Sequence, residues 1–327
     1  MIAYILRSIA QAVMVMLAVA LLAFSMFRFV GDPIANMVGQ EASVAERAEL
    51  AERLGLNAPF PIQFLHFIGD VARGEFGMSY RQGRPVRDLL MERVPATVEL
   101  ALLSSLFALV FGIALGVYSA INRRGVLANI AMSLSLVGVS LPTFLIGIGL
   151  IYLFAVELRW LPSFGRGEVT RLGWWTTGLL TETGRKSLIM PVLTLGFFQL
   201  TLIMRLVRAE MLEALRTDYV KFARARGIPE RSISFRHALR NTMIPVVTIA
   251  GLQFGAVIAF AIVTETVFQW PGLGAMFIQA VQFVDIPVMA AYLMFVALVF
   301  VVVNLTVDLL YFALDPRLRG TTAAPAR

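Results

Sequence analysis

Six long stretches without a charged residue constrain this chain more than any other feature of its sequence. A helix rises about 1.5 Å per residue, so about 20 apolar residues cross the roughly 30 Å hydrocarbon core of a bilayer. Each stretch is near or above that length and rich in Leu, Val, Ile, Ala and Phe. The stretches are 8–27, 100–122, 125–156, 187–204, 241–264 and 286–307. We therefore predict an all-α integral membrane protein with six transmembrane helices.

Two of the stretches leave a choice open. The first could be a signal peptide, but the apolar core of a signal has about 7–15 residues and this stretch has about 20, so we expect a retained helix. The third is long enough for one span and a further turn, and its span is expected to begin near Ser133. Pro142 either simply kinks that span or has a functional role, because prolines are tolerated in membrane helices.

Composition removes several classes of protein. Of the 327 residues, 58% are hydrophobic and 15% are charged, whereas a soluble domain has about 25% charged residues. The absence of cysteine excludes disulfides, thiolate metal sites and cysteine nucleophiles. With only two histidines, His66 and His237, a membrane subunit that carries haem on paired histidines is not expected. We expect His66 to be a surface histidine.

Several catalytic and transport motifs are missing from the sequence. No G-x-x-x-x-G-K-[ST] loop, HExxH or GxSxG occurs, so we expect no nucleotide site, catalytic residue or metal site in this chain. Glu99, Glu265 and Asp308 lie near the ends of the stretches, whereas proton-coupled carriers keep ionisable groups near mid-membrane. A secondary carrier acting alone, with a Na⁺ site made of backbone carbonyls, stays a less favoured alternative. A scaffold subunit of a membrane enzyme is opposed by the histidine count.

The positions of Lys and Arg predict the orientation of the chain, because cytoplasmic loops carry an excess of both. Nine basic residues lie within 205–240, and the short loop after the second stretch holds Arg123 and Arg124. The loop between 264 and 286 holds no Lys or Arg. We therefore place both termini in the cytoplasm.

This orientation divides the chain into four parts. They are an N-terminal transmembrane helix (1–30), a periplasmic loop region (31–95), a five-helix core (96–315) with a cytoplasmic loop at 205–243, and a cytoplasmic tail (316–327). The first loop is expected to hold a helix at 41–54. The Trp-rich third loop, with Trp160, Trp174 and Trp175, is expected to hold a helix at the membrane–water interface.

The cytoplasmic segment 205–227 has the pattern of an amphipathic helix. Leu212, Leu215, Tyr219, Phe222 and Ala223 fall within about 100° of a helical wheel. Gly227 is placed to end the helix as a C′ residue with positive φ, and a second short helix is predicted over 232–241. A basic loop that only sets orientation, or a helix lying on lipid, remains an alternative for this segment.

This segment resembles the coupling loop of ABC importer permeases. The resemblance is carried by Asp218-Tyr219-Val220, Ala223-Arg224-Ala225-Arg226-Gly227 and His237-Ala238-Leu239-Arg240-Asn241. It is strongest for the first permease subunit of the dipeptide/oligopeptide/nickel/glutathione permease family. Lys221-Phe222-Ala223 stands where the wider importer pattern has Glu-Ala-Ala, a departure shared by the peptide-type subgroup. The extended third loop, 165–186, also departs from the family pattern, and the sequence assigns it no role.

Other segments resemble the same family in the same order along the chain. They are 77–81, 93–100, 140–144, 265–274, 284–287 and 315–317. Together with the coupling loop they extend the resemblance over nearly the whole sequence.

The resemblance implies a type I ABC importer permease fold in a bacterial inner (plasma) membrane. The chain would form half of a pore for dipeptides or oligopeptides, or alternatively for glutathione or nickel. A second homologous permease, two ATPase subunits holding ATP and Mg²⁺, and a periplasmic solute-binding protein would be its partners, with membrane lipid around it and no nucleic acid.

The resemblance also assigns roles to two sets of residues. The ATPase-coupling set is Asp218, Tyr219, Phe222, Ala223, Arg224, Ala225 and Gly227. The candidate outer gate is Glu265, Phe268, Trp270, Pro271, Gly272 and Gly274. A plainer interpretation of the second set is a tight outer turn with Trp270 at the membrane interface. Asn304 and Asp308, four residues apart, are expected to be helix-packing contacts.

Overall fold

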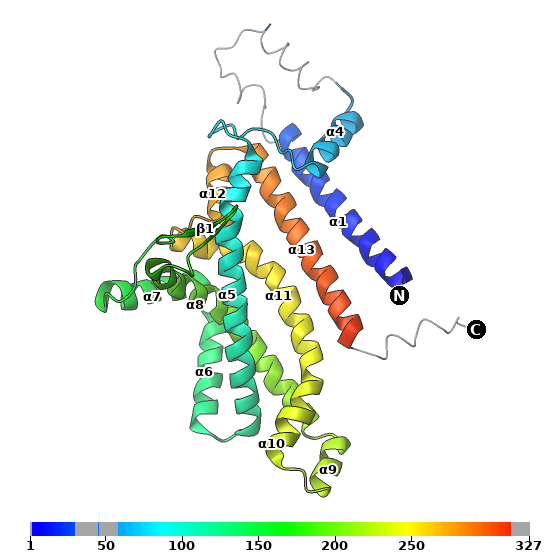
Figure 1. The fold of residues 1–327 in the computed structure, drawn as a ribbon, viewed down its shortest axis with the longest axis vertical. Helices are drawn as coiled ribbons and strands as arrows, with labels where there is room; N and C mark the ends of the chain where they lie inside the picture. Colours follow the sequence, from blue (N-terminus) through cyan, green and yellow to red (C-terminus); the bar gives the residue numbers. More distant parts are fainter. Residues whose placement is uncertain (1, 30–44, 46–57, 315–327) are drawn as a thin grey trace, which may run out of the picture.

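The structure, a computed structural model, describes residues 2–29, 45 and 58–314, and it is helical over most of that length (Figure 1). Apart from residue 45, the predicted helix at 41–54 lies outside the described residues, as does the tail at 316–327. The main helices are α1 (Ile2–Phe29), α4 (Phe60–Ala72), α5 (Val86–Ile121), α6 (Val126–Ser140), α7 (Thr143–Leu150), α8 (Glu182–Ala214), α9 (Asp218–Ala225), α10 (Glu230–Ser232), α11 (Leu239–Val267), α12 (Leu273–Gln282) and α13 (Ile286–Leu314).

Shorter elements complete the described fold. Two π-helical segments, η1 (Ile151–Glu157) and η2 (Ile233–Ala238), continue α7 and precede α11. A two-stranded antiparallel sheet, β1 (Thr170–Leu172) and β2 (Trp175–Thr177), lies in the Trp-rich loop between η1 and α8. The interfacial helix expected in that loop is therefore wrong, because the segment turns back on itself at Gly173, which has a φ of 67°.

Five helical segments of the described chain are long and apolar enough to cross a membrane, and a bent pair gives a sixth. The five are Ser8–Phe27, Val86–Ile121, Glu182–Ala214, Glu230–Val267 and Ile286–Val307. The bent pair is Val126–Ser140 with Thr143–Glu157. Each of these six segments overlaps one of the six predicted stretches.

The third stretch departs most from its prediction. Its first helix begins at Val126 rather than near Ser133, and the chain bends by 113° between Ser140 and Thr143. Leu141 has the extended φ and ψ of −88° and 135° that a residue before proline prefers. Pro142, which has no N–H to continue the first helix, becomes the N-cap of α7. The proline therefore breaks the helix rather than merely kinking it.

Two other helix boundaries also differ from their predictions. The helix α8 begins at Glu182, where the Thr181 hydroxyl oxygen accepts a hydrogen bond from the Gly184 N–H, and it extends well past the apolar stretch. The separate helix predicted over 232–241 is wrong. Ile233 and Leu239 keep helical φ and ψ at both junctions, so α10, η2 and α11 form one continuous helical segment.

Small residues let the two central helices pack closely. A Cβ added at Gly116 of α5 would lie 2.7 Å from the Val207 Cβ of α8, and one added at Gly196 of α8 would lie 2.8 Å from the Ser104 carbonyl oxygen. Such close approach of backbones is typical of helix pairs in membranes, where small residues form the contact.

The helix α1 packs against α13, and α4 covers the C-terminal end of α1. The Phe24 ring of α1 lies 5.1 Å from the Phe60 ring and 5.6 Å from the Phe64 ring of α4, measured between centroids. Figure 1 places α9 and α10 at one end of the elongated molecule and α4 and α12 at the other. The two sets of candidate functional residues therefore lie at opposite ends.

Candidate functional site

The helix α9 is separate from the long helix that precedes it. The helix α8 ends at Ala214, and Thr217 has the extended φ and ψ of −68° and 157° that begin a new helix. The Thr217 hydroxyl donates to the Ala214 carbonyl at 2.5 Å, which takes up an acceptor at the end of α8. The apolar arc predicted from Leu212 to Ala223 is therefore not on one helix, because the helix breaks at 215–217.

The two faces of α9 have different surroundings. Val220 and Ala223 are buried against Ile233, with Leu215 and Ile228 beside them. On the other side, 41% of Tyr219 and 64% of Phe222 are exposed. Of the residues predicted to form the apolar face, Ala223 packs within the chain, whereas Tyr219 and Phe222 are exposed.

A glycine corner joins α9 to α10. Gly227 has a φ of 76°, which confirms the predicted positive φ. Its N–H donates to the Arg224 carbonyl at 2.9 Å, and the Ile228 N–H donates to the Ala223 carbonyl at 3.2 Å, which is the Schellman pattern of a helix end.

One ion pair spans the same corner, and a second lies within α9. Arg224 Nε donates to Glu230 Oε1 at 2.6 Å and links α9 to α10. Asp218 pairs with Lys221 at 2.8 Å within α9. Ala225 is exposed near the end of the helix. Six of the seven predicted coupling residues therefore lie on α9, which presents two exposed aromatic side chains, and the seventh, Gly227, forms the corner that ends it.

At the opposite end, the residues 265–274 fold against one turn of α5. The Thr97 hydroxyl donates to Glu265 Oε1 at 2.6 Å and accepts from the Leu273 N–H at 2.8 Å. The second carboxylate oxygen of Glu265 accepts from the Ala275 N–H at 2.9 Å. Glu265 is fully buried, so these donors replace water around its carboxylate.

Two glycines make this packing possible. A Cβ on Gly272 would overlap the Glu265 carboxylate, and a Cβ on Gly274 would lie 2.6 Å from Ile262 Cγ1. Neither glycine has a positive φ, so steric room rather than backbone conformation requires glycine at both positions.

Trp270 is fully buried and donates its indole N–H to the Ala96 carbonyl at 3.0 Å. Phe268 is also buried, and Pro271 is half-buried. The plainer interpretation, with Trp270 exposed at the membrane interface, is wrong, because the indole lies inside the protein. The six candidate gate residues form one packed cluster in this structure.

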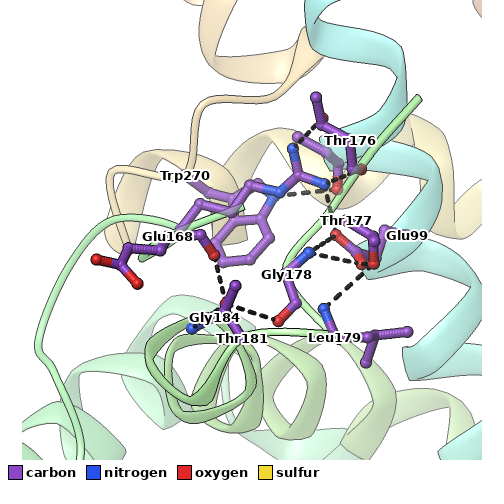
Figure 2. Close-up of polar contacts among 11 residues, drawn as sticks. Glu99, Glu168, Thr176, Thr177, Gly178, Leu179, Thr181, Gly184 and Trp270 are labelled. Atoms are coloured by element: carbon purple, nitrogen blue, oxygen red, sulfur yellow. Dashed lines mark hydrogen bonds and ion pairs between the residues drawn. The ribbon is translucent and has the colours of Figure 1, made fainter. Parts of the chain in front are cut away.

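A second carboxylate, Glu99, lies beside this cluster and forms an ion pair that was not predicted. Glu99 is buried, and its Oε2 pairs with Arg166 Nη2 at 2.5 Å. Its Oε1 accepts from the Thr177 hydroxyl at 2.5 Å and from the Gly178 N–H at 3.1 Å, as Figure 2 shows. Sequence spacing gave no signal for this pair, because 67 residues separate Glu99 from Arg166.

Two of the resembling motifs, 77–81 and 284–287, meet at Asp285. Its carboxylate accepts from the Ser79 hydroxyl at 2.5 Å and from the Tyr80 N–H at 3.1 Å. Burial and the nearby Asp285 carboxylate raise the pKa of Tyr80 to about 12. The Arg81 guanidinium lies 3.5 Å from the Phe283 ring centroid.

Three other residues singled out in the sequence are His66, Asn304 and Asp308. His66 is exposed, as expected. Asn304 borders a cavity of about 550 Å³ between α1, α11 and α13, whereas the Asp308 side chain lies outside the described part of the chain. Among the described residues, no group of three or more His, Asp or Glu side chains could hold a metal ion.

Comparison with known families decides the class of this chain. Residues 112–320 match the family described as binding-protein-dependent transport system inner membrane component. Residues 1–101 match the N-terminal membrane component of the same transport systems. The chain belongs to this permease family. The permease is thus a multi-pass inner-membrane protein, and its resemblance to ABC importer permeases is confirmed.

Relatives of this permease match it over nearly its whole length. It is 36% identical to the dipeptide transport system permease protein DppB of Alkalihalophilus pseudofirmus, over 98% of this chain and 100% of the relative. It is 38% identical to the di/tripeptide permease protein DppB of Pseudomonas aeruginosa, over 98% and 99%. It is 36% identical to the glutathione permease protein GsiC of Salmonella typhimurium, over 98% and 99%.

A solved structure shows the same fold. The inward-facing MetNI methionine ABC transporter matches with a TM-score of 0.54 at 19% identity, covering 69% of this chain and 96% of that chain. The predicted type I ABC permease fold is therefore confirmed.

Proposed function

We propose that this permease forms half of the membrane pore of an ATP-driven importer for short peptides. The full-length similarity to permeases named for dipeptides and tripeptides is the observation that carries this proposal. A second, homologous permease supplies the other half of the pore, and a periplasmic solute-binding protein delivers the peptide.

The helix α9 is the proposed contact with an ATPase subunit. Its exposed Tyr219 and Phe222 offer apolar area, while Val220 and Ala223 fix the helix to the rest of the chain. The Arg224–Glu230 pair and the corner at Gly227 restrict its orientation. A short helix that is braced in this way transmits a displacement, whereas a flexible loop absorbs it. ATP and Mg²⁺ bind on the partner ATPases.

Exposed apolar side chains support a role as one part of a larger pore. Leu102, Leu106 and Val110 recur every four residues along α5, and each is more than half exposed. Residues at this spacing lie on one face of a helix. Such a stripe is covered by lipid or by a second membrane subunit, as expected for half of a pore.

The proposed orientation follows from the ends of the molecule. The α9 end carries the basic segment 205–240 and lies in the cytoplasm, and the opposite end, with α4 and α12, lies in the periplasm. Both termini are then cytoplasmic, and the region 31–95 is periplasmic.

Competition for uptake tests the proposed substrate. Cells that carry the complete transporter are given a radiolabelled dipeptide with an excess of unlabelled dipeptide, tetrapeptide, glutathione or chelated nickel. The proposal expects the peptides to compete. Uptake of labelled glutathione without uptake of labelled dipeptide would favour the glutathione alternative, for which the similarity to GsiC is the supporting observation.

A further inference from the structure

The third outer loop, defined here as residues 159–181, is attached to the rest of the molecule through buried polar contacts. Arg166 is 8% exposed and Glu99 is 4% exposed, so their ion pair lies inside the protein. Figure 2 shows Thr177 and Gly178 of this loop gathered around the Glu99 carboxylate, with Trp270 close by. A loop that only connected two helices would not need a buried charge pair.

Arg166 contacts two different structural elements. Its Nη2 atom donates to Glu99 Oε2 of α5 and to the Thr176 carbonyl at 2.7 Å. Its guanidinium carbon lies 5.9 Å from the centroid of the Trp270 ring, within the range of a cation–π contact. The preceding Gly165 donates its N–H to the Phe268 carbonyl at 2.9 Å. Two successive residues of the loop thus contact the turn between α11 and α12.

One turn of α5 holds the same two elements from the other side. Ala96 binds the turn between α11 and α12 through Trp270. Thr97 binds Glu265 at the end of α11 and Leu273 at the start of α12. Glu99, two residues further on, binds the third outer loop. The loop, the turn and α5 therefore meet at one place, and each contacts the other two.

Further contacts hold the third outer loop in place beside α5 and the turn between α11 and α12. Gly167 has a φ of 67°, and a Cβ there would lie 2.8 Å from the Thr183 carbonyl carbon. The Thr181 hydroxyl donates to the Glu168 carbonyl at 2.6 Å and accepts from the Gly184 N–H at 3.1 Å, which fixes the loop to the start of α8. If the loop moved away, the buried Glu99 carboxylate would lose its cation, which is strongly unfavourable.

We propose that Arg166 is a positioning residue that holds Trp270, and with it the turn between α11 and α12, against α5. The outer ends of α5, α8 and α11 then move together as one body, with the third outer loop joining them. The role of this motion in transport rests on the proposed function, whereas the contact itself does not.

Quenching of Trp270 fluorescence tests the contact in the purified full chain. The chain has four tryptophans, so replacing Trp160, Trp174 and Trp175 with Phe leaves Trp270 as the single reporter. Arg166→Met is expected to raise the acrylamide quenching constant of Trp270 about threefold, because a buried indole becomes reachable. Arg171→Met, an exposed arginine of the same loop, is the matched control and leaves quenching unchanged.

A double variant separates positioning from simple charge neutralisation. Glu99→Gln combined with Arg166→Met removes both buried charges, so it is expected to fold even if Arg166→Met alone does not. The proposal expects raised quenching of Trp270 in the double variant at a wild-type melting temperature. Wild-type quenching in the double variant would show that Arg166 only neutralises Glu99, and it would overturn the proposal.

Uptake by the complete transporter then tests the consequence. The double variant is expected to lower peptide uptake at wild-type membrane levels. Wild-type uptake together with raised quenching would overturn the claim that the position of this turn matters for transport. Because quenching needs no partner subunit, failure of the contact and failure of the proposed function give different results.

Discussion

The Ser79 hydroxyl donates a hydrogen bond to the Asp285 carboxylate across 206 residues of sequence, and both residues are 2% exposed. The same carboxylate accepts the Tyr80 N–H. One buried side chain thus fixes the loop before α5 to the turn between α12 and α13.

Asp285→Ala should destabilise the protein, because it leaves the buried Ser79 hydroxyl and the Tyr80 N–H without their acceptor. Each buried polar group left without a partner lowers the free energy of unfolding by about 1–3 kcal/mol. The melting temperature of the purified permease should fall by several degrees. Asp70→Ala, at an exposed residue paired with Arg73 at 3.8 Å, is the control and should change it little. Equal melting temperatures for the two variants would contradict the assigned contact.

Gly272→Ala should also lower the melting temperature, since the added Cβ would overlap the Glu265 carboxylate. Overpacking of this kind costs about 1–3 kcal/mol. The control is Gly149→Ala in α7, where a Cβ would meet no described atom within 4 Å. Alanine is favoured over glycine within a helix, so the control should be neutral or slightly stabilising. A destabilised control beside an unaffected Gly272→Ala would refute the packing described between Gly272 and Glu265.

Some of this structure could be predicted from the sequence, and the reason is physical. A helix that crosses lipid needs an apolar surface, so each span forms a continuous apolar run. Such a run can be found in the sequence without knowing what the helix packs against. Gly227 was predictable because a helix end with positive φ selects glycine locally. In contrast, Glu99 and Arg166 are joined only by the folded chain, and no spacing encodes their contact.

The misassigned face of α9 has a similar explanation. A helical wheel places Tyr219, Phe222 and Ala223 on one side of the helix because of their spacing. The spacing does not show whether other parts of the protein cover each side chain. The break at Thr217 came from a local hydrogen bond that competes with the helix. For Pro142 the sequence indicated a kink or a functional role, whereas the proline in fact ends one helix and begins the next.

Gly227→Val should reduce transport without unfolding the permease. At a φ of 76° a residue with a Cβ costs on the order of 1–2 kcal/mol, and a Cβ there meets no described atom within 4 Å. This free-energy cost is small beside the energy with which the six spans pack. The substitution is nevertheless expected to change the direction of α9. Gly125→Val, at an ordinary φ of −68°, is the control. Wild-type uptake by Gly227→Val at normal expression would mean that the segment only sets orientation.

Cysteine labelling should show the two ends of the molecule on opposite sides of the membrane. The chain has no native cysteine, so Gln82→Cys and Phe222→Cys give single reporters at exposed positions. In intact spheroplasts an impermeant maleimide should label position 82, while position 222 should react only after lysis. The opposite pattern would reverse the orientation and remove α9 from the ATPase side.

The most direct measurement is peptide accumulation in proteoliposomes. The permease is reconstituted with its sister permease and two ATPase subunits, the binding protein and labelled dipeptide are supplied outside, and ATP is enclosed within. Accumulation that requires both ATP and the ATPase subunits is the predicted result. Accumulation by the permease alone, driven by an ion gradient without ATP, would contradict the account and favour a secondary carrier.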